Sequence, residues 1–147
     1  MSGLAALLAG HNKPDIYQWH NAFPVGDVRH AVQHAHWTFV HLDGWAVEDK
    51  TSFLKAVTAA FAFSDHLGES FDALSDSLAD VTAGESEGIV MLWDGWGPLS
   101  RAQEQVFSVA LSVFGGRVNA ERGGKFAVLL RGEGPTIDVP ELVAKPG

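Results

Sequence analysis

The stretch GIVMLWDG, residues 88–95, says more about the fold than any other part of the sequence. Five apolar residues follow one another from Ile89 to Trp93, and an Asp-Gly pair typical of a turn comes directly after them. A strand with both faces buried has such an uninterrupted apolar run, because neither face meets water. We therefore predict a strand here that is buried on both faces.

Two further β-rich runs lie on either side of this one, WTFVHLDG at residues 37–44 and KFAVLLRG at residues 125–132. Helical patterns separate the three runs, with apolar residues recurring at three- and four-residue spacing. They cover residues 27–35, 50–61, 66–80 and 100–114. Alternation of strands and helices is typical of an α/β domain with right-handed crossovers. The sequence thus predicts a small, mostly parallel sheet packed with helices.

The residues that cap these helices predict where they begin and end. Asp27 is the N-cap that we expect for the first helix. Ser100 and Gln103 form a capping-box pattern before the next long apolar run. Gly115 and Gly116 are expected to end the helix that this run forms.

We predict one domain, with its core at residues 25–132 and a less regular segment at each end. Residues 1–24 form an N-terminal extension that starts with one or two helical turns. Within it, DIYQW at residues 15–19 is expected to dock on the body in an extended form. Residues 133–147 are rich in Pro and Gly, so we expect a flexible tail there.

Composition limits the functions to consider. The chain has 147 residues, 46% of them hydrophobic, and a formal net charge of −8. The excess of acids argues against nucleic acid as a direct partner, because phosphate binding needs clustered Lys and Arg, and it is compatible with a basic protein. The lack of cysteine excludes disulfides and thiolate chemistry. Since no apolar run is long enough to span a membrane, we expect no membrane partner and a cytoplasmic protein.

The stretch HLGESFDALSDSLAD, residues 66–80, contains four acids and no lysine or arginine. On a helix that continues one residue further, four apolar residues would share the core-facing side: Phe71, Leu74, Leu78 and Val81. Three acids would share the opposite side: Asp72, Asp76 and Asp80. The helix dipole favours Asp72 near the N-terminus and opposes Asp80 near the C-terminus. The spacing by itself leaves two interpretations open, a solvated face and a face that binds a cation from another molecule.

Other kinds of site find little support in the sequence. His30 and His34 lie one turn apart and could hold a metal together with an acid, but no HExxH motif accompanies them. Phosphate-binding glycine loops and a GxSxG elbow do not occur. Asp72 and Asp76 lack the burial on which acid–base catalysis by paired carboxyls depends. We expect no enzyme activity, cofactor or metal site, and keep a metal-binding or enzymatic protein that uses the histidines as an alternative.

The segment LGESFDALSDSL, residues 67–78, closely resembles the GxNxDALxDxL motif of the barstar family, the intracellular inhibitors of barnase-type ribonucleases. FVHLDG, MLWDGWGPLS and AVLLRGEGP also look like segments of barstar-related proteins, of the kind found in actinobacteria. Residues 1–24 look like the N-terminal extension of those proteins. The resemblance covers nearly the whole chain and implies a three-stranded parallel sheet packed with helices.

The resemblance also implies a function. Proteins of this family plug a ribonuclease active site, because their acidic helix and the loop before it lie where the phosphates of RNA would bind. The implied partner site has seven residues: His66, Gly68, Glu69, Asp72, Ser75, Asp76 and Asp80. Asp76 matches the central acidic contact and Asp72 the acid one turn earlier, and the implied partner is a basic ribonuclease of the extracellular type. A barstar-fold module for a basic partner that is not a nuclease is the alternative.

Three positions depart from the family pattern. Ser70 replaces the asparagine of the loop, Ser75 replaces an interface tryptophan, and Val81 falls where the family has another aromatic residue. The acid that the family carries at the end of its last helix has no clear counterpart in this sequence. The charged half of the implied interface therefore persists, while much of its aromatic half is missing.

Overall fold

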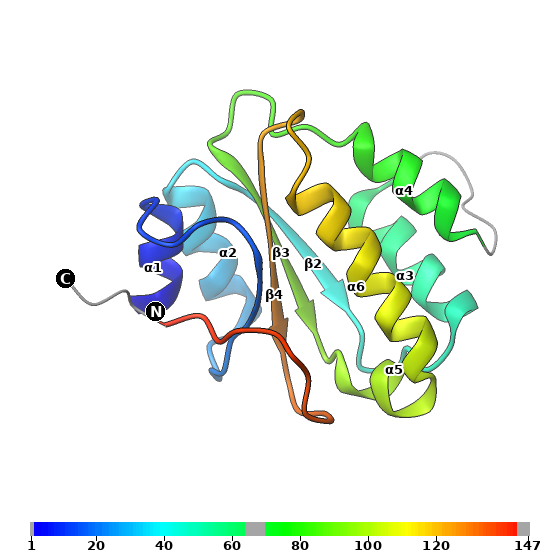
Figure 1. Cartoon of the computed structure of the whole chain (residues 1–147). Coiled ribbons are helices and arrows are strands. Elements are labelled where there is room, and N and C mark those ends of the chain that lie inside the picture. Colours follow the sequence, from blue (N-terminus) through cyan, green and yellow to red (C-terminus); the bar gives the residue numbers. More distant parts are fainter. Residues whose placement is uncertain (1, 64–69, 144–147) are drawn as a thin grey trace.

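Four parallel strands form one sheet in the computed structural model of this protein, which describes residues 2–63 and 70–143 (Figure 1). Across the sheet the order is β1 (Ile16–Gln18), β4 (Lys125–Arg131), β3 (Gly88–Asp94) and β2 (Thr38–Asp43). All neighbouring pairs run parallel, which confirms the predicted α/β class. The sheet has four strands rather than three, because the segment that was expected to dock in an extended form pairs with β4 as β1.

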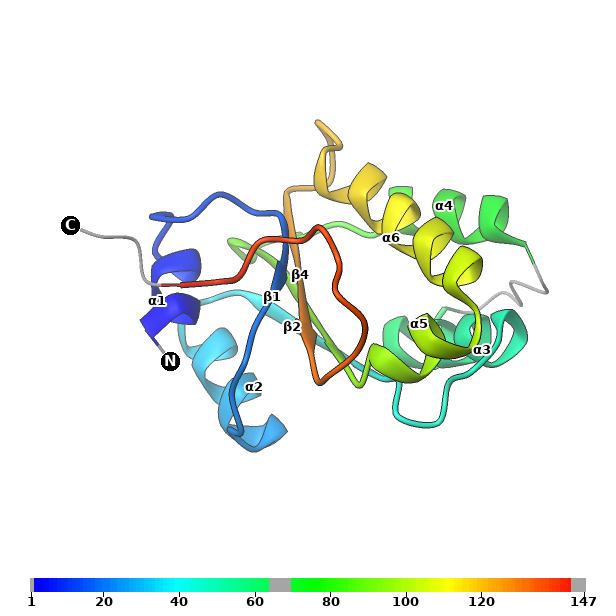
Figure 2. The same cartoon turned by 60° about the horizontal axis from the view of Figure 1, so that its bottom comes forward.

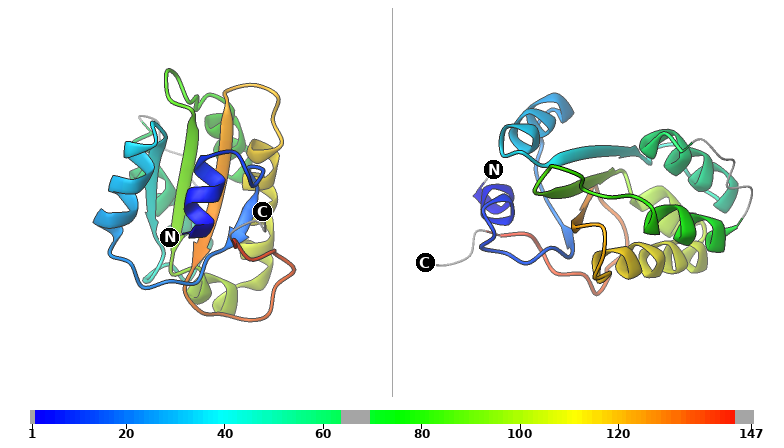
Figure 3. Two further views of the ribbon diagram at one scale, coloured as in Figure 1. Left: turned by 90° about the vertical axis from the view of Figure 1, so that its left-hand side faces the viewer. Right: turned by 90° about the horizontal axis from the view of Figure 1, so that it is seen from above.

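Helices cover both faces of the sheet (Figures 2 and 3). One face carries α1 (Ser2–Leu8) and α2 (Val25–His34). The other carries α3 (Lys50–Phe61), α4 (Phe71–Ala79), α5 (Gly97–Ala102) and α6 (Glu104–Val118). Every residue of β3 is buried, as the apolar run predicted, because this central strand has a neighbour on each side and a helical layer on each face.

Alternate residues of each strand supply the two cores. Toward α1 and α2 the strands present Val90, Leu92, Ala127 and Leu129. Toward α3, α4 and α6 they present Leu42, Met91, Trp93, Phe126 and Val128. Aromatic rings concentrate in this second core, where Phe53 of α3 contacts Trp93 with ring centroids 5.3 Å apart. The acidic stretch of the sequence therefore belongs to the layer that packs on the larger, more aromatic core.

The predicted start of α2 is wrong. The helix begins at Val25, directly after Pro24, which has an extended conformation (φ −55°, ψ 145°). Asp27 lies in the first turn, and no side chain caps this end through a hydrogen bond. With Asp27 as its cap the helix would begin at Val28, and it begins three residues earlier because Pro24, whose ring fixes its own φ, occupies the N-cap position.

The predicted boundaries of α6 are also wrong. Ser100 is buried inside the separate helix α5, and Gln103 joins α5 to α6 without a side-chain cap. At the other end, α6 runs through Gly115–Gly116 to Val118. Each glycine costs a helix roughly 1 kcal/mol relative to alanine. Burial of the helical residues on both sides of the pair, Phe114 and Arg117, offsets that cost.

The segment after β4 returns along the free edge of β1 (Figure 2). Gln18 and Glu141 form a parallel bridge, and the N–H of Leu142 donates to the carbonyl of Gln18 at 2.8 Å. The Leu142 side chain is buried. We expected a flexible tail from residue 133 onward; the part that the structure describes, up to Val143, is hydrogen-bonded to the edge of the sheet.

Candidate functional site

Helix α4 is held to the body of the protein at its start and along one side. The hydroxyl of Ser70 caps it by accepting a hydrogen bond from the N–H of Ala73 at 3.0 Å. Leu74 and Leu78 are buried in the larger core. Phe71 and Val81 pack against the same core, so the predicted apolar stripe is confirmed. The serine that departs from the family pattern thus still performs a structural task, because it satisfies a backbone donor of the first turn.

The opposite side of α4 faces solvent. The four described members of the predicted partner site are all exposed: Asp72, Ser75, Asp76 and Asp80. Asp80 is the C-cap, and the other three belong to the helix itself. Within residues 2–63 and 70–143, no cation forms an ion pair with any of these aspartates. Three carboxylates on one rigid surface are therefore left to attract a positive group from outside.

Three members of the predicted partner site lie outside the described residues: His66, Gly68 and Glu69. They precede Ser70, the cap of α4, by one to four positions. The structure therefore places the helical part of the predicted site, and the loop part stays a prediction.

A buried arginine fixes the far end of α4, which sequence reasoning missed. The guanidinium of Arg117 in α6 donates to the carbonyls of Val81 and Gly123 at 3.0 Å and of Gly124 at 3.2 Å. It also lies 5.0 Å from the ring centroid of Phe126. Burial lowers the pKa of Arg117 from its usual high value, but an arginine stays charged at neutral pH.

Arg117 does not neutralise the acidic face. Its donors are directed to backbone carbonyls, that of Val81 just beyond the C-terminus of α4 and those of Gly123 and Gly124 before β4. A cation near the end of α4 also interacts favourably with the helix dipole. Arg117 is only 4% exposed, so it is hidden from solvent, whereas the acidic face of α4 is exposed. The sequence does contain a signal for this contact, because Arg117 is a charged residue within the apolar pattern of residues 106–118. A lone arginine on a core-facing helix needs buried acceptors.

The alternative metal site gains no support from the geometry. The rings of His30 and His34 stack with centroids 5.9 Å apart. In the part of the chain that the structure describes, no three His, Asp or Glu side chains are placed to hold a metal ion. Over the same residues, no helix has the length and apolar character needed to cross a bilayer.

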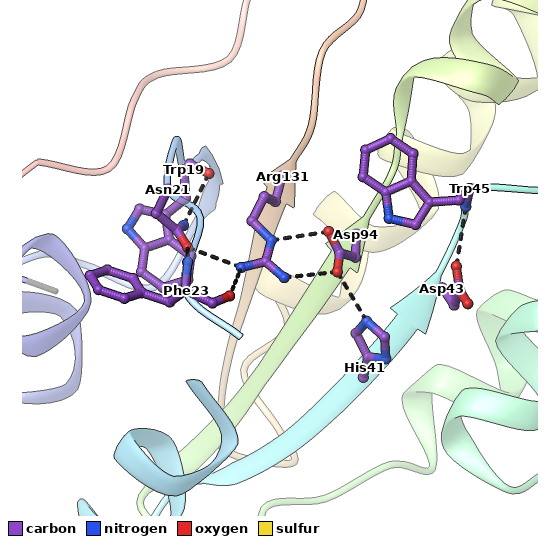
Figure 4. A network of polar contacts seen from close by, with 8 residues as sticks. All are labelled: Trp19, Asn21, Phe23, His41, Asp43, Trp45, Asp94 and Arg131. Atoms are coloured by element: carbon purple, nitrogen blue, oxygen red, sulfur yellow. Dashed lines mark hydrogen bonds and ion pairs between the residues drawn. The ribbon is translucent and has the colours of Figure 1, made fainter. Parts of the chain in front are cut away.

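A second charged group lies at the carboxyl ends of the strands (Figure 4). Asp94 ends β3 and Arg131 ends β4, and the two are register partners. Nε and Nη2 of Arg131 donate to the two carboxylate oxygens of Asp94 at 3.0 and 2.8 Å. His41 approaches one of these oxygens at 3.3 Å. Both members of the ion pair are buried.

The surroundings of Asp94 act on its pKa in opposite directions. Burial raises the pKa of this carboxyl, but the hydrogen bonds and charge of Arg131, with a smaller contribution from His41, together lower it below its ordinary value. Asp94 is therefore a structural anion whose charge is compensated within the protein. The sequence indicates this pair, because Asp94 and Arg131 each come directly after a buried apolar run.

Comparison with known families agrees with this geometry. A family described as Barstar (barnase inhibitor) matches residues 37–131, which is more than half of the chain. This protein belongs to the barstar family. Among curated proteins, the same sequence found no match.

The barstar match separates two parts of the structure. It begins at Trp37 and ends at Arg131, so it contains β2, β3, β4 and helices α3 to α6. The acidic helix α4 lies inside it. The segments α1, β1 and α2 precede it: β1 adds an edge strand to the sheet, and α1 and α2 cover its opposite face. In this chain the barstar match therefore covers three strands of the sheet and the helical layer on one face, and the helical layer on the other face lies outside it.

Proposed function

We propose that this barstar-family protein binds and blocks a basic ribonuclease through the exposed face of α4 and the loop before it. The family description, a barnase inhibitor, supports the class of partner. The observation that carries the proposal is the set of three exposed aspartates that no cation in the described residues neutralises. We place the protein in the cytoplasm as part of this proposal.

The way α4 is held supports a binding role. Ser70 satisfies its first turn, two buried leucines hold it to the core, and Arg117 donates to the carbonyl of Val81 just after its end. A helix fixed in this way loses little conformational freedom when a partner binds, which favours affinity. Charge that is already in place also attracts a basic partner over long distances and accelerates association.

The proposed inhibition is a physical block. A ribonuclease active site is cationic because it must bind the phosphates of RNA. Asp72 and Asp76 lie one helical turn apart, and their carboxylates would occupy the cationic groups that otherwise hold RNA. No bond is made or broken in this process, so the protein needs neither a cofactor nor a catalytic residue.

An inhibition assay tests the proposal. The purified protein is added to barnase, and cleavage of a fluorogenic RNA is measured at low and high salt. We expect inhibition that weakens with salt, and Asp76→Asn should raise the half-inhibiting concentration by about tenfold or more. Barnase and barstar are among the complexes from which this range is known, so it is an expectation for the family.

Asp27→Asn is the matched control, since it removes one exposed carboxylate from α2 on the opposite layer. It should leave inhibition unchanged. Full inhibition by both Asp72→Asn and Asp76→Asn would refute the acidic-face mechanism.

A basic partner that is not a nuclease is the second candidate. It is favoured by Ser75, which exposes a hydroxyl between the two aspartates where the family presents an aromatic contact. Binding of lysozyme, a basic protein without ribonuclease activity, is the comparison. Salt-sensitive binding of lysozyme without inhibition of barnase would favour this candidate over the first.

A further inference from the structure

The face of the sheet under α1 and α2 changes from apolar to charged toward the carboxyl ends of the strands. Val90 and Leu92 of β3 belong to the buried core on this face, and Asp94 continues the same alternation. Register pairs place Asp43 beside Asp94 and Asp94 beside Arg131. At the carboxyl ends of β2, β3 and β4, the register partners therefore form a row of two acids and one base.

This row has one carboxylate without a cation. Arg131 is bound bidentately to Asp94, and its Nη1 donates to Asn21 Oδ1 at 2.9 Å and to the Phe23 carbonyl at 2.7 Å. Asp43 is exposed and accepts a hydrogen bond from the N–H of Trp45 at 3.2 Å. No described residue forms an ion pair with it. Like charges directly opposite one another in a sheet are unfavourable, so a further cation here would stabilise the row.

A pocket of about 350 Å³ opens beside this row. Its lining includes Asn21, Phe23, Trp45, Asp94, Arg131 and Gly132. Asp43 does not line it, but it neighbours two lining residues, as the register partner of Asp94 and the acceptor for the Trp45 N–H. Figure 4 shows Arg131 and Asp94 between the aromatic side chains of Phe23 and Trp45. The Trp45 and Phe23 side chains are 55% and 37% exposed, which makes them two of the few large apolar side chains at the surface of the described chain. The pocket is thus lined by the ion pair of Asp94 and Arg131 and by the aromatic side chains of Phe23 and Trp45.

Trp45 is held in place although it is exposed. Its ring lies so close to the backbone of Gly95 that a Cβ there would be 2.5 Å from the indole, and a Cβ at Gly132 would be 3.1 Å away. Both glycines have positive φ, +79° and +120°, at the turns that end β3 and β4. One face of the indole therefore packs against the backbone of two glycines, and its other face is available for stacking.

The pocket also lies where open α/β sheets bind ligands. After β1 the chain passes the carboxyl edge through residues 19–24 and continues to α2 on one face. After β2 and β3 it continues to α3 and α5 on the other face. These connections do not come from adjacent strands, because β4 lies between β1 and β3. The pocket therefore shares with the ligand sites of open α/β sheets only its place outside the carboxyl ends of the strands.

We propose that the exposed face of Trp45 and the neighbouring carboxylate of Asp43, beside this pocket, bind the guanidinium group of an arginine presented by a partner protein. A planar cation can stack on the free face of Trp45 and bond the carboxylate of Asp43 at the same time. An anion is disfavoured by the exposed carboxylate of Asp43 and by the engagement of Arg131 with protein acceptors. A metal ion lacks three suitably placed ligands among the described residues.

A protein-borne arginine fits better than a free small molecule. Phe23 and Trp45 are exposed beside the Asp94–Arg131 pair, so they can contact the aliphatic stem of the arginine and the neighbouring residues of its polypeptide. Trp and Arg are also enriched among the residues that dominate protein interfaces. This proposal does not rest on ribonuclease inhibition, because the pocket belongs to the carboxyl edge of the sheet and shares no residue with α4.

Peptide titration followed by NMR tests the proposal. The probes are acetyl-Gly-Arg-Gly-amide and the same peptide with citrulline, a neutral isostere of arginine, each added up to about 10 mM to the full chain. We expect saturable shifts of the Trp45 indole N–H with the arginine peptide and at least about tenfold weaker binding with citrulline. Trp45→Ala should abolish binding, Trp45→Phe and Asp43→Asn should weaken it, and Val109→Ala on the exposed side of α6 should not change it.

Four results would overturn the proposal. These are absence of saturable binding by the arginine peptide, equal binding of the citrulline peptide, equal binding of free arginine, and preferential binding of adenosine or inorganic phosphate. The spectrum of unliganded Trp45→Ala, compared with that of the unaltered protein, establishes that its loss of binding is not a loss of fold. Asp76→Asn should bind the arginine peptide normally, which separates this site from the acidic helix.

Discussion

Asp94 and Asp76 are the same residue type in the same chain, yet their surroundings give them different tasks. Asp94 is buried at the end of β3 and bonded twice by Arg131. Asp76 lies on the exposed side of α4, and no described cation pairs with it. A compensated, buried acid contributes to folding, whereas an exposed acid among others of its charge contributes to association. The number of acids in a sequence is therefore less informative than where their counter-charges come from.

Removing the counter-charge of the buried acid should have the largest effect. Arg131→Met leaves the Asp94 carboxylate buried without its partner, and loss of one member of a buried pair costs about 3–5 kcal/mol. Urea unfolding at pH 7 measures the loss. The double variant Asp94→Leu with Arg131→Met is the control, and should recover most of the stability because it buries no charge. A cost below about 1 kcal/mol for Arg131→Met would show that water compensates Asp94 instead.

The same pair predicts a dependence of stability on pH. Because the folded protein lowers the pKa of Asp94, the resulting stabilisation is complete above the ordinary aspartate pKa of about 4 and is lost as pH falls through the lower, folded value. As pH falls below about 4, the free energy of unfolding of the unaltered protein should therefore approach that of Asp94→Asn. Urea unfolding of both proteins over this range measures the difference. A difference that stays constant would contradict the role given to Arg131.

The cap of the acidic helix should have a smaller effect. Ser70→Ala removes the acceptor for the N–H of Ala73, and loss of a helix N-cap costs about 1 kcal/mol. The variant should also bind a basic partner less tightly, because the first turn that carries Asp72 loses its support. Ser75→Ala, an exposed change in the middle of the same helix, is the matched control and should not destabilise the protein. Equal stability of the two variants would mean that packing alone holds α4.

The smallest effects should have opposite signs at the two ends of α4. Asp80→Asn removes an acid near the C-terminus and relieves repulsion from Asp76, so it should stabilise the protein by about 0.3–0.5 kcal/mol. Asp72→Asn removes an acid from the first turn and should destabilise it by about as much. Thermal unfolding at low salt measures both changes. Two shifts of the same sign would mean that local charge around α4 outweighs the helix dipole.

The sequence predicts most of the fold because its strands are apolar runs with clear ends. The buried strand at residues 88–94, the apolar side of α4 and the exposure of Asp76 are all readable from spacing. The strand status of residues 16–18 is not, because three residues carry too short a pattern and their partner lies more than a hundred residues away. The same holds for Arg117, whose acceptors are backbone carbonyls that spacing does not reveal.

Helix ends were predicted less well than helices. Ser100 matches a capping pattern, but packing buries it within α5. Gly115 and Gly116 match a stop, but the core contacts of Phe114 and Arg117 extend α6 beyond them. In each case tertiary packing outweighs a local preference of about 1 kcal/mol, and only the folded structure contains that packing.

Strand β1 has a consequence for aggregation. If the chain were reduced to residues 37–131, β4 would become an edge strand with a row of unpaired backbone groups, and the apolar face under α1 and α2 would be uncovered. Open edges and large apolar faces both promote sheet-to-sheet association between molecules. Size-exclusion chromatography of such a truncated chain should show oligomers, and a monomer would mean that the edge is protected in another way. If oligomers form, a role of the N-terminal extension in protecting this edge would follow from the pairing of β1 with β4.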